Sequence, residues 1–150
     1  MFSHQLGQVV PSLLLSVGLT SGLTVTVSPA MLEIIDQAEL VSINYAHSAL
    51  SSSLKVNHLL AGLSSKNEIL IDGKAVTLKH GYPVAKVSEL EKVATFGTQT
   101  LVNNTDNTVT IWSMYKSYCF KYSESTLVGN TINSAKISDV SFAPDEVCPS

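Results

Sequence analysis

Four histidines are the side chains of this 150-residue sequence best suited to hold a metal ion or to move a proton near neutral pH: His4, His47, His58 and His80. His47 and His58 are eleven positions apart, which places both on nearly the same face of a helix. A metal site would also need cysteine or carboxylate ligands at a suitable spacing, and the neighbouring sequence offers none. We therefore predict solvated or half-buried imidazoles, with no metal site and no cofactor.

A polar run follows in the second half of the chain, where Asn103, Asn104, Asp106 and Asn107 carry side-chain oxygens that calcium could use. Calcium favours several carboxylates and this run has one, so a polar turn is the preferred interpretation. Serine, histidine and aspartate are plentiful, yet the sequence contains no Gly-x-Ser-x-Gly nucleophile elbow. We predict no catalytic residues and no enzymatic activity.

The two cysteines, Cys119 and Cys148, lie far apart and match no metal-binding spacing. Behind a segment that directs export, a disulfide in an oxidising compartment is the preferred interpretation, and two buried thiols in a cytosolic protein are the alternative. A disulfide would stabilise the folded chain by about 3 kcal/mol through the entropy of the loop that it closes.

Charge patterning argues against a nucleic-acid partner. Nine lysines and no arginine stand against twelve acidic residues, which gives a net charge of -3. No basic stripe is present to neutralise phosphates, and arginine is the residue best suited to bidentate recognition of phosphate or guanine. We therefore predict that the protein does not bind nucleic acid.

The opening of the chain is uncharged, since no Asp, Glu, Lys or Arg occurs between Met1 and Leu32. Its most apolar part, 9–27, has nineteen residues, about the number that a helix needs to cross a hydrocarbon layer of ~30 Å. We interpret it as a membrane segment. A secretory signal peptide cleaved near 28–30 is the alternative, but 1–7 has no lysine or arginine and the apolar run is longer than such signals require.

Behind this stretch, the sequence predicts an amphipathic helix of about 30 residues that ends near Gly62, with a kink at Pro29 where the apolar half begins to change into the amphipathic half. Its apolar positions recur at steps of three or four, and we expect them to face the sheet: Ile34, Ala38, Val41, Tyr45, Ala49, Ser52, Val56, Leu60 and Leu63.

The remaining sequence predicts short strands and one short helix, so the fold class is α+β with a small antiparallel sheet packed on the long helix. An Asp72–Gly73 turn joins the first two strands. We expect Ser88 to be the N-cap of the short helix, and we expect Trp112, Tyr115, Tyr118 and Tyr122 to be core or sheet-face aromatics. The predicted segments are strands at 68–71 and 75–78, ended by 81–83, a helix at 87–94, strands at 100–102, 108–114 and 118–122, a loop at 123–135 and a last strand at 137–142.

The order of these parts resembles the type IV pilins, and more narrowly the pilins of the mannose-sensitive haemagglutinin (MSHA) family. Gly7 stands where the family's leader ends, Gln8 where the mature chain begins, and Pro29 where the family has its helix proline. The run 71–83 is the most specific local similarity. Cys119 and Cys148 resemble the pair that bounds the C-terminal loop of pilins.

The sequence also departs from the family's pattern, since Pro11 stands where an apolar helix former is usual and the leader has no basic residue. Ser12 stands where the family has a glutamate, and Gln8 replaces the usual aromatic residue. In the family, that glutamate neutralises the methylated N-terminus inside the membrane, and serine cannot do so. A divergent or tip-located subunit, an unprocessed leader and an altered start of the gene remain open.

The resemblance implies three parts: a leader-like segment 1–7, an apolar membrane and filament-core helix 8–29, and an amphipathic helix with a β-rich pilin head at 30–150. It implies a major or minor subunit of an MSHA-type pilus used in surface attachment, held in the bacterial inner membrane with its head in the periplasm and then assembled at the cell surface. Its partners would be other pilin subunits, the inner-membrane assembly machinery and the lipid bilayer. The alternatives are a monomeric periplasmic or surface binding domain anchored by one helix, a soluble exported protein, and a pseudopilin of type II secretion.

Overall fold

The structure is a computed structural model, and it describes residues 29–64, 67–104 and 106–149. The predictions for the leader-like segment, the apolar helix before Pro29, Gly7, Gln8, Ser12 and His4 lie outside the described residues. Pro29 is the first described residue of its helix, so the predicted kink also lies outside them. The chain divides into two units, Met1–Ile35 and Asp36–Ser150, and the second unit, here called the head, is described below.

The long helix α2 spans Pro29–Ser64, and within the head one of its faces is buried. The buried side chains recur at steps of three or four, as one stripe of a helix requires: Glu39, Ile43, Ala46, Leu50, Leu54, Asn57 and Ala61. The predicted helix is confirmed, and it ends at Ser64, close to the predicted end near Gly62. Gly62 lies inside α2, because a glycine in a helix costs only about 1 kcal/mol and does not force the helix to end.

The predicted apolar face of α2 does not pack on the sheet. Val41, Tyr45 and Leu63 are 69%, 72% and 85% exposed, on the side of the helix away from the buried stripe. The prediction was wrong because α2 carries two apolar stripes, and the buried one includes two polar residues. Glu39 accepts a hydrogen bond from Tyr115 N at 2.8 Å, and Asn57 Nδ2 donates one to Ser53 Oγ at 3.1 Å. These bonds make their burial acceptable.

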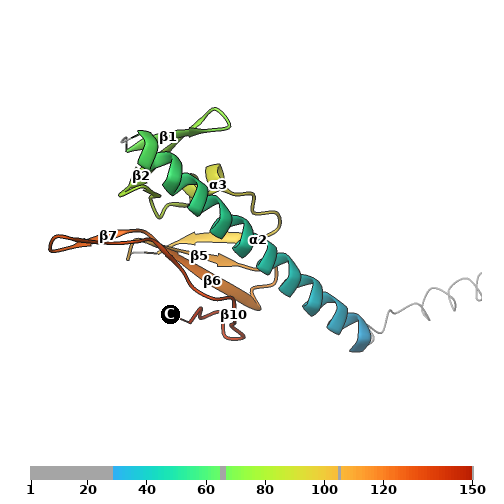
Figure 1. The fold of residues 1–150 in the computed structure, drawn as a ribbon. Coiled ribbons are helices and arrows are strands. Elements are labelled where there is room, and N and C mark those ends of the chain that lie inside the picture. Colours follow the sequence, from blue (N-terminus) through green and yellow to red (C-terminus); the bar gives the residue numbers. More distant parts are fainter. Residues whose placement is uncertain (1–28, 65–66, 105, 150) are drawn as a thin grey trace, which may run out of the picture. The chain divides into compact units, whose positions relative to one another are not determined.

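Three short strands form the first antiparallel sheet, in the order β1–β2–β3 (Figure 1). Its strands are β1 (Glu68–Ile71), β2 (Lys74–Lys79) and β3 (Tyr82–Pro83). The predicted hairpin is confirmed, since Asp72 (φ 50°) and Gly73 (φ 76°) adopt the left-handed conformation that a tight turn needs. The segment 81–83 does not simply end the hairpin, because β3 pairs with the end of β2.

The helix α3 (Val87–Val93) follows, as predicted, but its N-cap is Lys86 and not Ser88. Lys86 has extended backbone geometry and makes no side-chain capping bond. Asn103 Oδ1 instead accepts a hydrogen bond from Val87 N at 2.9 Å, so a residue distant in sequence satisfies one amide of the first turn.

The second sheet has five strands, in the order β10–β6–β5–β4 with β9 also paired to β6, and α2 crosses it (Figure 1). The strands are β4 (Thr100–Asn103), β5 (Thr108–Trp112), β6 (Tyr118–Ser123), β9 (Lys136–Ile137) and β10 (Ser141–Phe142). Val109, Ile111, Phe120 and Tyr122 are fully buried and belong to the same core as Leu50 of α2. The fold class α+β is therefore confirmed.

The prediction of one continuous last strand at 137–142 is wrong. Tyr122 pairs with Ile137 but Cys119 pairs with Ser141, so the partner strand has one extra residue between β9 and β10. Lys121 N donates to Ser138 Oγ at 2.9 Å where a regular ladder would use a backbone acceptor. A β-bulge therefore divides the strand in two.

The predicted loop 123–135 is also corrected, because it contains a hairpin. Strands β7 (Thr126–Val128) and β8 (Thr131–Asn133) pair antiparallel as a separate two-stranded sheet. Gly129 has a φ of 61° at the turn between them, a value that glycine adopts without strain.

The disulfide is formed. Cys119 and Cys148 have Cα atoms 5.9 Å apart, within the usual range for a bridge. Both are buried with Trp112 and Ala143 in a small cluster of their own. The bond therefore ties the end of the chain to strand β6.

Candidate functional site

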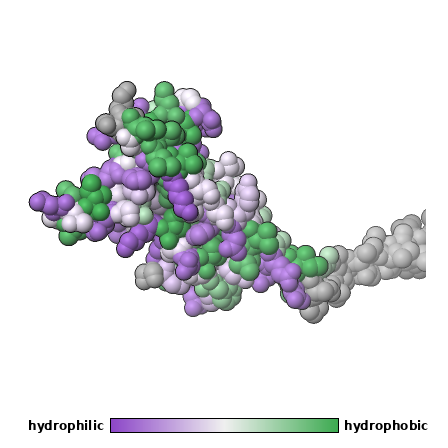
Figure 2. Space-filling model, in the orientation of Figure 1, coloured by the Kyte–Doolittle hydropathy of each residue, from purple (hydrophilic) through white to green (hydrophobic). Residues whose placement is uncertain are grey.

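One candidate surface of the head is the exposed apolar side of α2. We call it the outward stripe and define it by six side chains: Val41, Tyr45, Val56, Leu59, Leu60 and Leu63. Each of them is at least 45% exposed, and five of them are more than half exposed. Figure 2 shows hydrophobic surface over the C-terminal end of α2.

This stripe has no structural role within the head, because the core uses the other side of the helix. Burying a large aliphatic or aromatic side chain contributes about 1.5–3 kcal/mol. The four stripe residues from Val56 to Leu63 lie within about two helical turns of one another, so they form an exposed apolar cluster of the kind that marks an interaction site. The arrangement is suited to docking of a partner surface.

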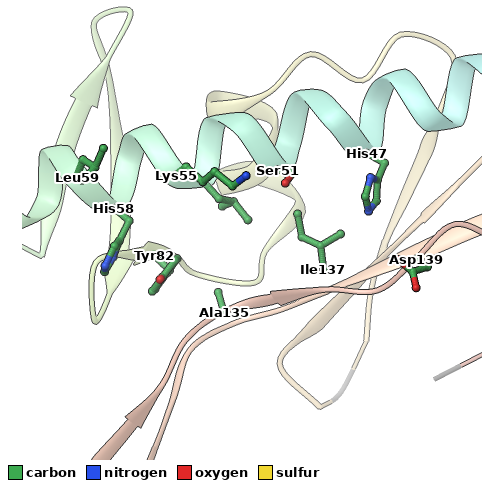
Figure 3. A pocket seen from close by; sticks show the side chains of 10 residues that line it. His47, Ser51, Lys55, His58, Leu59, Tyr82, Ala135, Ile137 and Asp139 are labelled. Carbon is green, nitrogen blue, oxygen red and sulfur yellow. The ribbon is translucent and has the colours of Figure 1, made fainter.

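A second candidate is a cleft of about 520 Å³ beside the same helix (Figure 3). Side chains of α2 form one wall, while Tyr82 and the segment around Ile137 form the other. The lining residues are His47, Ser51, Leu54, Lys55, His58, Leu59, Tyr82, Ala135, Ile137 and Asp139. Polar and apolar groups alternate there, so the cleft can receive a small molecule with both kinds of surface.

Both predicted same-face histidines line this cleft, so the prediction from their spacing is confirmed. His47 Nε2 lies 3.2 Å from the carbonyl oxygen of Ser138, and the ring of His47 meets that of Phe120 edge-on at 5.1 Å. His58 stacks on Tyr82 with ring centroids 4.3 Å apart. The imidazoles are therefore held by packing and by a backbone contact.

The third described histidine, His80, lies apart from these two. Its Nδ1 is 3.3 Å from Ser125 Oγ. Within the ranges that the structure describes, no three His, Cys, Asp or Glu side chains gather as metal ligands would.

Asn104, Asp106 and Asn107 of the polar run lie between β4 and β5, and two of these side chains bond within the protein. Asn104 Nδ2 donates to Thr108 Oγ1 at 2.9 Å and to Thr110 Oγ1 at 2.8 Å. Thr108 Oγ1 donates to Asp106 Oδ1 at 2.6 Å. The described part of the run is thus a hydrogen-bonded polar turn, as the preferred interpretation predicted.

The aromatic residues divide between the core and the surface. Tyr122 is fully buried, and burial raises the pKa of its hydroxyl, which donates to Pro83 O at 2.6 Å. Tyr118 Oη donates to Asp36 Oδ2 at 3.1 Å, and burial and this carboxylate both raise the pKa of Tyr118. The predicted core role is wrong for Tyr115, which is 63% exposed because it lies in the turn between β5 and β6.

Sequence reasoning did not single out three buried carboxylates, Glu39, Glu89 and Glu124. Each accepts a hydrogen bond from a backbone amide in another element: Tyr115 N, Thr77 N and Ala85 N, respectively. Glu39 lies about one helical turn before the buried Ile43, and this spacing was the one sequence signal that Glu39 would be buried. The three groups join elements of the head, and none of them lines the cleft.

Glu89 gives the head a pH-dependent contact between α3 and β2. Burial opposes its ionisation, but hydrogen bonds from Lys92 Nζ at 2.8 Å and Thr77 N at 2.8 Å outweigh burial and hold the pKa of Glu89 below its ordinary value. The ionised form is thus favoured in the folded state. Its contribution is present above the unfolded pKa of about 4.3 and is lost as the pH falls through the folded pKa.

We therefore expect Glu89→Gln to lower the free energy of unfolding by about 1 kcal/mol at pH 7, with the difference from the unsubstituted chain shrinking below about pH 4. Urea denaturation at a series of pH values measures both effects. Glu91→Gln is the control, since Glu91 is exposed on the same helix and should change stability by less than about 0.5 kcal/mol. A Glu89→Gln effect that is the same at pH 3 and pH 7 would contradict the assigned role.

In comparisons with known proteins, no family model, no curated protein and no solved structure gives a significant match to this chain. The resemblance to type IV pilins therefore stays a prediction from the residues quoted above. Within the described ranges, no helix combines the length and the hydrophobicity that crossing a membrane requires. The apolar stretch 9–27, for which that role is predicted, lies outside these ranges.

Proposed function

We propose that this chain is a structural subunit of an MSHA-type type IV pilus, anchored in the bacterial inner membrane by residues 8–29 before assembly and used in surface attachment. The observation that carries the proposal is the outward stripe, an apolar face of α2 that the head leaves uncovered. A filament made from copies of this chain would cover it.

The sequence before the head strengthens this proposal. Residues 1–32 contain no charged side chain, so this part of the chain is also suited to an apolar environment, although Glu33, Asp36 and Glu39 stand between it and the outward stripe. A subunit that packs through its long helix needs this property over the whole interface, because an unpaired charge buried there would cost several kcal/mol. The α+β head with its C-terminal disulfide is compatible with a pilin head.

Assembly of such a subunit needs a machine. Lipid tails are as apolar as a filament core, so moving the helix from the membrane into the filament gains little from the hydrophobic effect alone. The proposed partners are therefore other pilin subunits and an energy-consuming assembly complex in the inner membrane.

Charge placed on the outward stripe tests the proposal. We expect Val56→Asp to lower the yield of filaments sheared from the cell surface by at least about tenfold, because an unpaired carboxylate would have to be buried between subunits. Val56 is 55% exposed, so thermal unfolding of the head should change little. Electron microscopy and immunoblotting of sheared fractions measure the yield.

Asn44→Asp is the matched control, since it adds the same charge at an exposed position on another side of the same helix. It should leave the filament yield close to that of the unsubstituted chain. Normal filaments from Val56→Asp, or an equal loss from both variants, would contradict the role of the stripe.

The intact mass of the mature protein tests the anchoring part of the proposal. Loss of residues 1–7 is expected of a processed pilin. A full-length chain would favour a tethered monomeric domain, and a new start near Met31 would favour a soluble exported protein.

A tethered binding domain is the second candidate, and the cleft beside α2 is the observation that favours it. Such a domain would remain monomeric, and Val56→Asp would not affect its location or amount. The filament assay and the mass measurement together distinguish the two functions.

A further inference from the structure

The hairpin formed by β7 and β8 is the part of the head least supported by the rest of the fold. Every residue from Thr126 to Ser134 is exposed. The two strands pair with each other and with no other strand that the structure describes. In Figure 1 the hairpin extends away from the sheet that contains β5 and β6.

The hairpin is also uncharged, and its hydrophobic residues are sorted onto its two faces. Leu127 pairs with Ile132, so both side chains project from one face, and they are 57% and 55% exposed. Val128 pairs with Thr131 on the opposite face. Leu127 and Ile132 therefore form a small apolar face, which we call the hairpin face.

An isolated two-stranded hairpin is marginally stable in water, and both of its edges are open to pairing or packing. Within a single head, the exposed apolar side chains of the hairpin add nothing to the stability of the fold. A partner surface that covers the hairpin face would stabilise the hairpin and remove these side chains from water.

The outward stripe supplies a surface of the matching kind. Between Val56 and Leu63 the helix has no Asp, Glu, Lys or Arg, like the hairpin itself. The chain as a whole carries a net charge of -3, so copies of it repel one another electrostatically. A contact between two uncharged surfaces does not bring like charges together.

We propose that the hairpin face of one copy packs on the outward stripe of the next copy, between Val56 and Leu63. The inference rests on the proposed filament and names one of its contacts. The two surfaces are different parts of the chain, so the contact is heterologous: each copy gives its hairpin to one neighbour and its stripe to another. Contacts of this kind can repeat along a filament and do not require a closed dimer.

The contact is an accessory one. Two side chains cover much less than the roughly 800 Å² per partner of a stable protein interface. The hairpin therefore adds strength and specifies which part of the stripe is covered, while the rest of the helix supplies most of the assembly interface. Loss of the hairpin face should weaken filaments without abolishing them.

Pairs of introduced cysteines test the position of the contact. Cells that express one copy with Leu127→Cys and another with Leu60→Cys should yield a disulfide-linked dimer in their filaments after mild oxidation. Thr131→Cys is the control in place of Leu127→Cys, because Thr131 lies on the opposite face of the hairpin. No dimer, or equal amounts from both pairs, would overturn the contact.

Removal of the hairpin face tests its strength. The double variant Leu127→Ser and Ile132→Ser should reduce filament yield by about tenfold, and Val128→Ser on the other face should reduce it far less. Unchanged filaments from the double variant would overturn this contact and leave the filament proposal standing. If the unsubstituted chain makes no filaments, both proposals are overturned.

Discussion

Replacing Cys119 and Cys148 with alanine is expected to lower the free energy of unfolding of the head by about 3 kcal/mol. The bond closes a loop with a sequence separation of 29, which restricts the unfolded chain. It is also buried against Trp112 and Ala143, so its loss removes packing at the same place. Urea denaturation of the oxidised chain and of the double variant measures the difference.

The reductant response provides the control for that experiment. A reducing agent should destabilise the unsubstituted chain and leave the double variant unaffected, because the variant has no bond to break. Equal stability of the two oxidised proteins would contradict the assigned contribution of the disulfide.

Glu124→Gln is expected to lower the free energy of unfolding by about 2 kcal/mol. The side chain of Glu124 is only 4% exposed, and it accepts hydrogen bonds from Lys79 Nζ at 2.5 Å and from Ala85 N at 3.1 Å. These bonds join the residue that follows β6 to β2 and to the segment before α3. Lys79 is 42% exposed and can be solvated again, which keeps the cost below that of a fully buried ion pair.

Glu146→Gln is the matched control for Glu124→Gln. Glu146 pairs with Lys116 at 3.0 Å, but both side chains are largely exposed, so we expect a change of less than about 0.5 kcal/mol. Thermal unfolding of the two variants in the same buffer gives the comparison. Equal effects at the two sites would show that burial of Glu124 contributes little.

Local signals in the sequence predicted most elements of the head. The helical period after Pro29, the Asp72–Gly73 turn and the alternation of Tyr118–Tyr122 each depend on near neighbours, and the corresponding elements are present. The disulfide was predicted from an apolar export signal and not from geometry. The cleft was anticipated only in part, through the spacing of His47 and His58.

The errors concern interactions between distant residues. The buried face of α2 contains Glu39, and a count of hydrophobic residues cannot foresee that Tyr115 N will satisfy this carboxylate. Likewise, Ser88 is a good N-cap by residue type, yet Asn103 supplies the bond to the first turn of α3 from another strand. Such partners become visible only when the chain is folded.

The hydrophobic pattern also left the role of the second apolar stripe open. A stripe such as Val41, Tyr45 and Leu63 predicts burial, and the sequence does not specify whether the burying surface belongs to the same molecule. In the head that surface is missing, which is why the wrong face of α2 was assigned to the core.

The bulge at Ser138 divides the partner strand of β6, so the C-terminal tail pairs with β6 independently of the chain before the bulge. Strand β6 pairs with Ile137 on one side of the bulge and with Ser141 on the other, so the tail is held in its own register. The segment between Ser125 and Ala135 starts and finishes beside residues that the fold fixes, and it is exposed between them. A change in the length of this segment should therefore leave Cys148 within reach of Cys119.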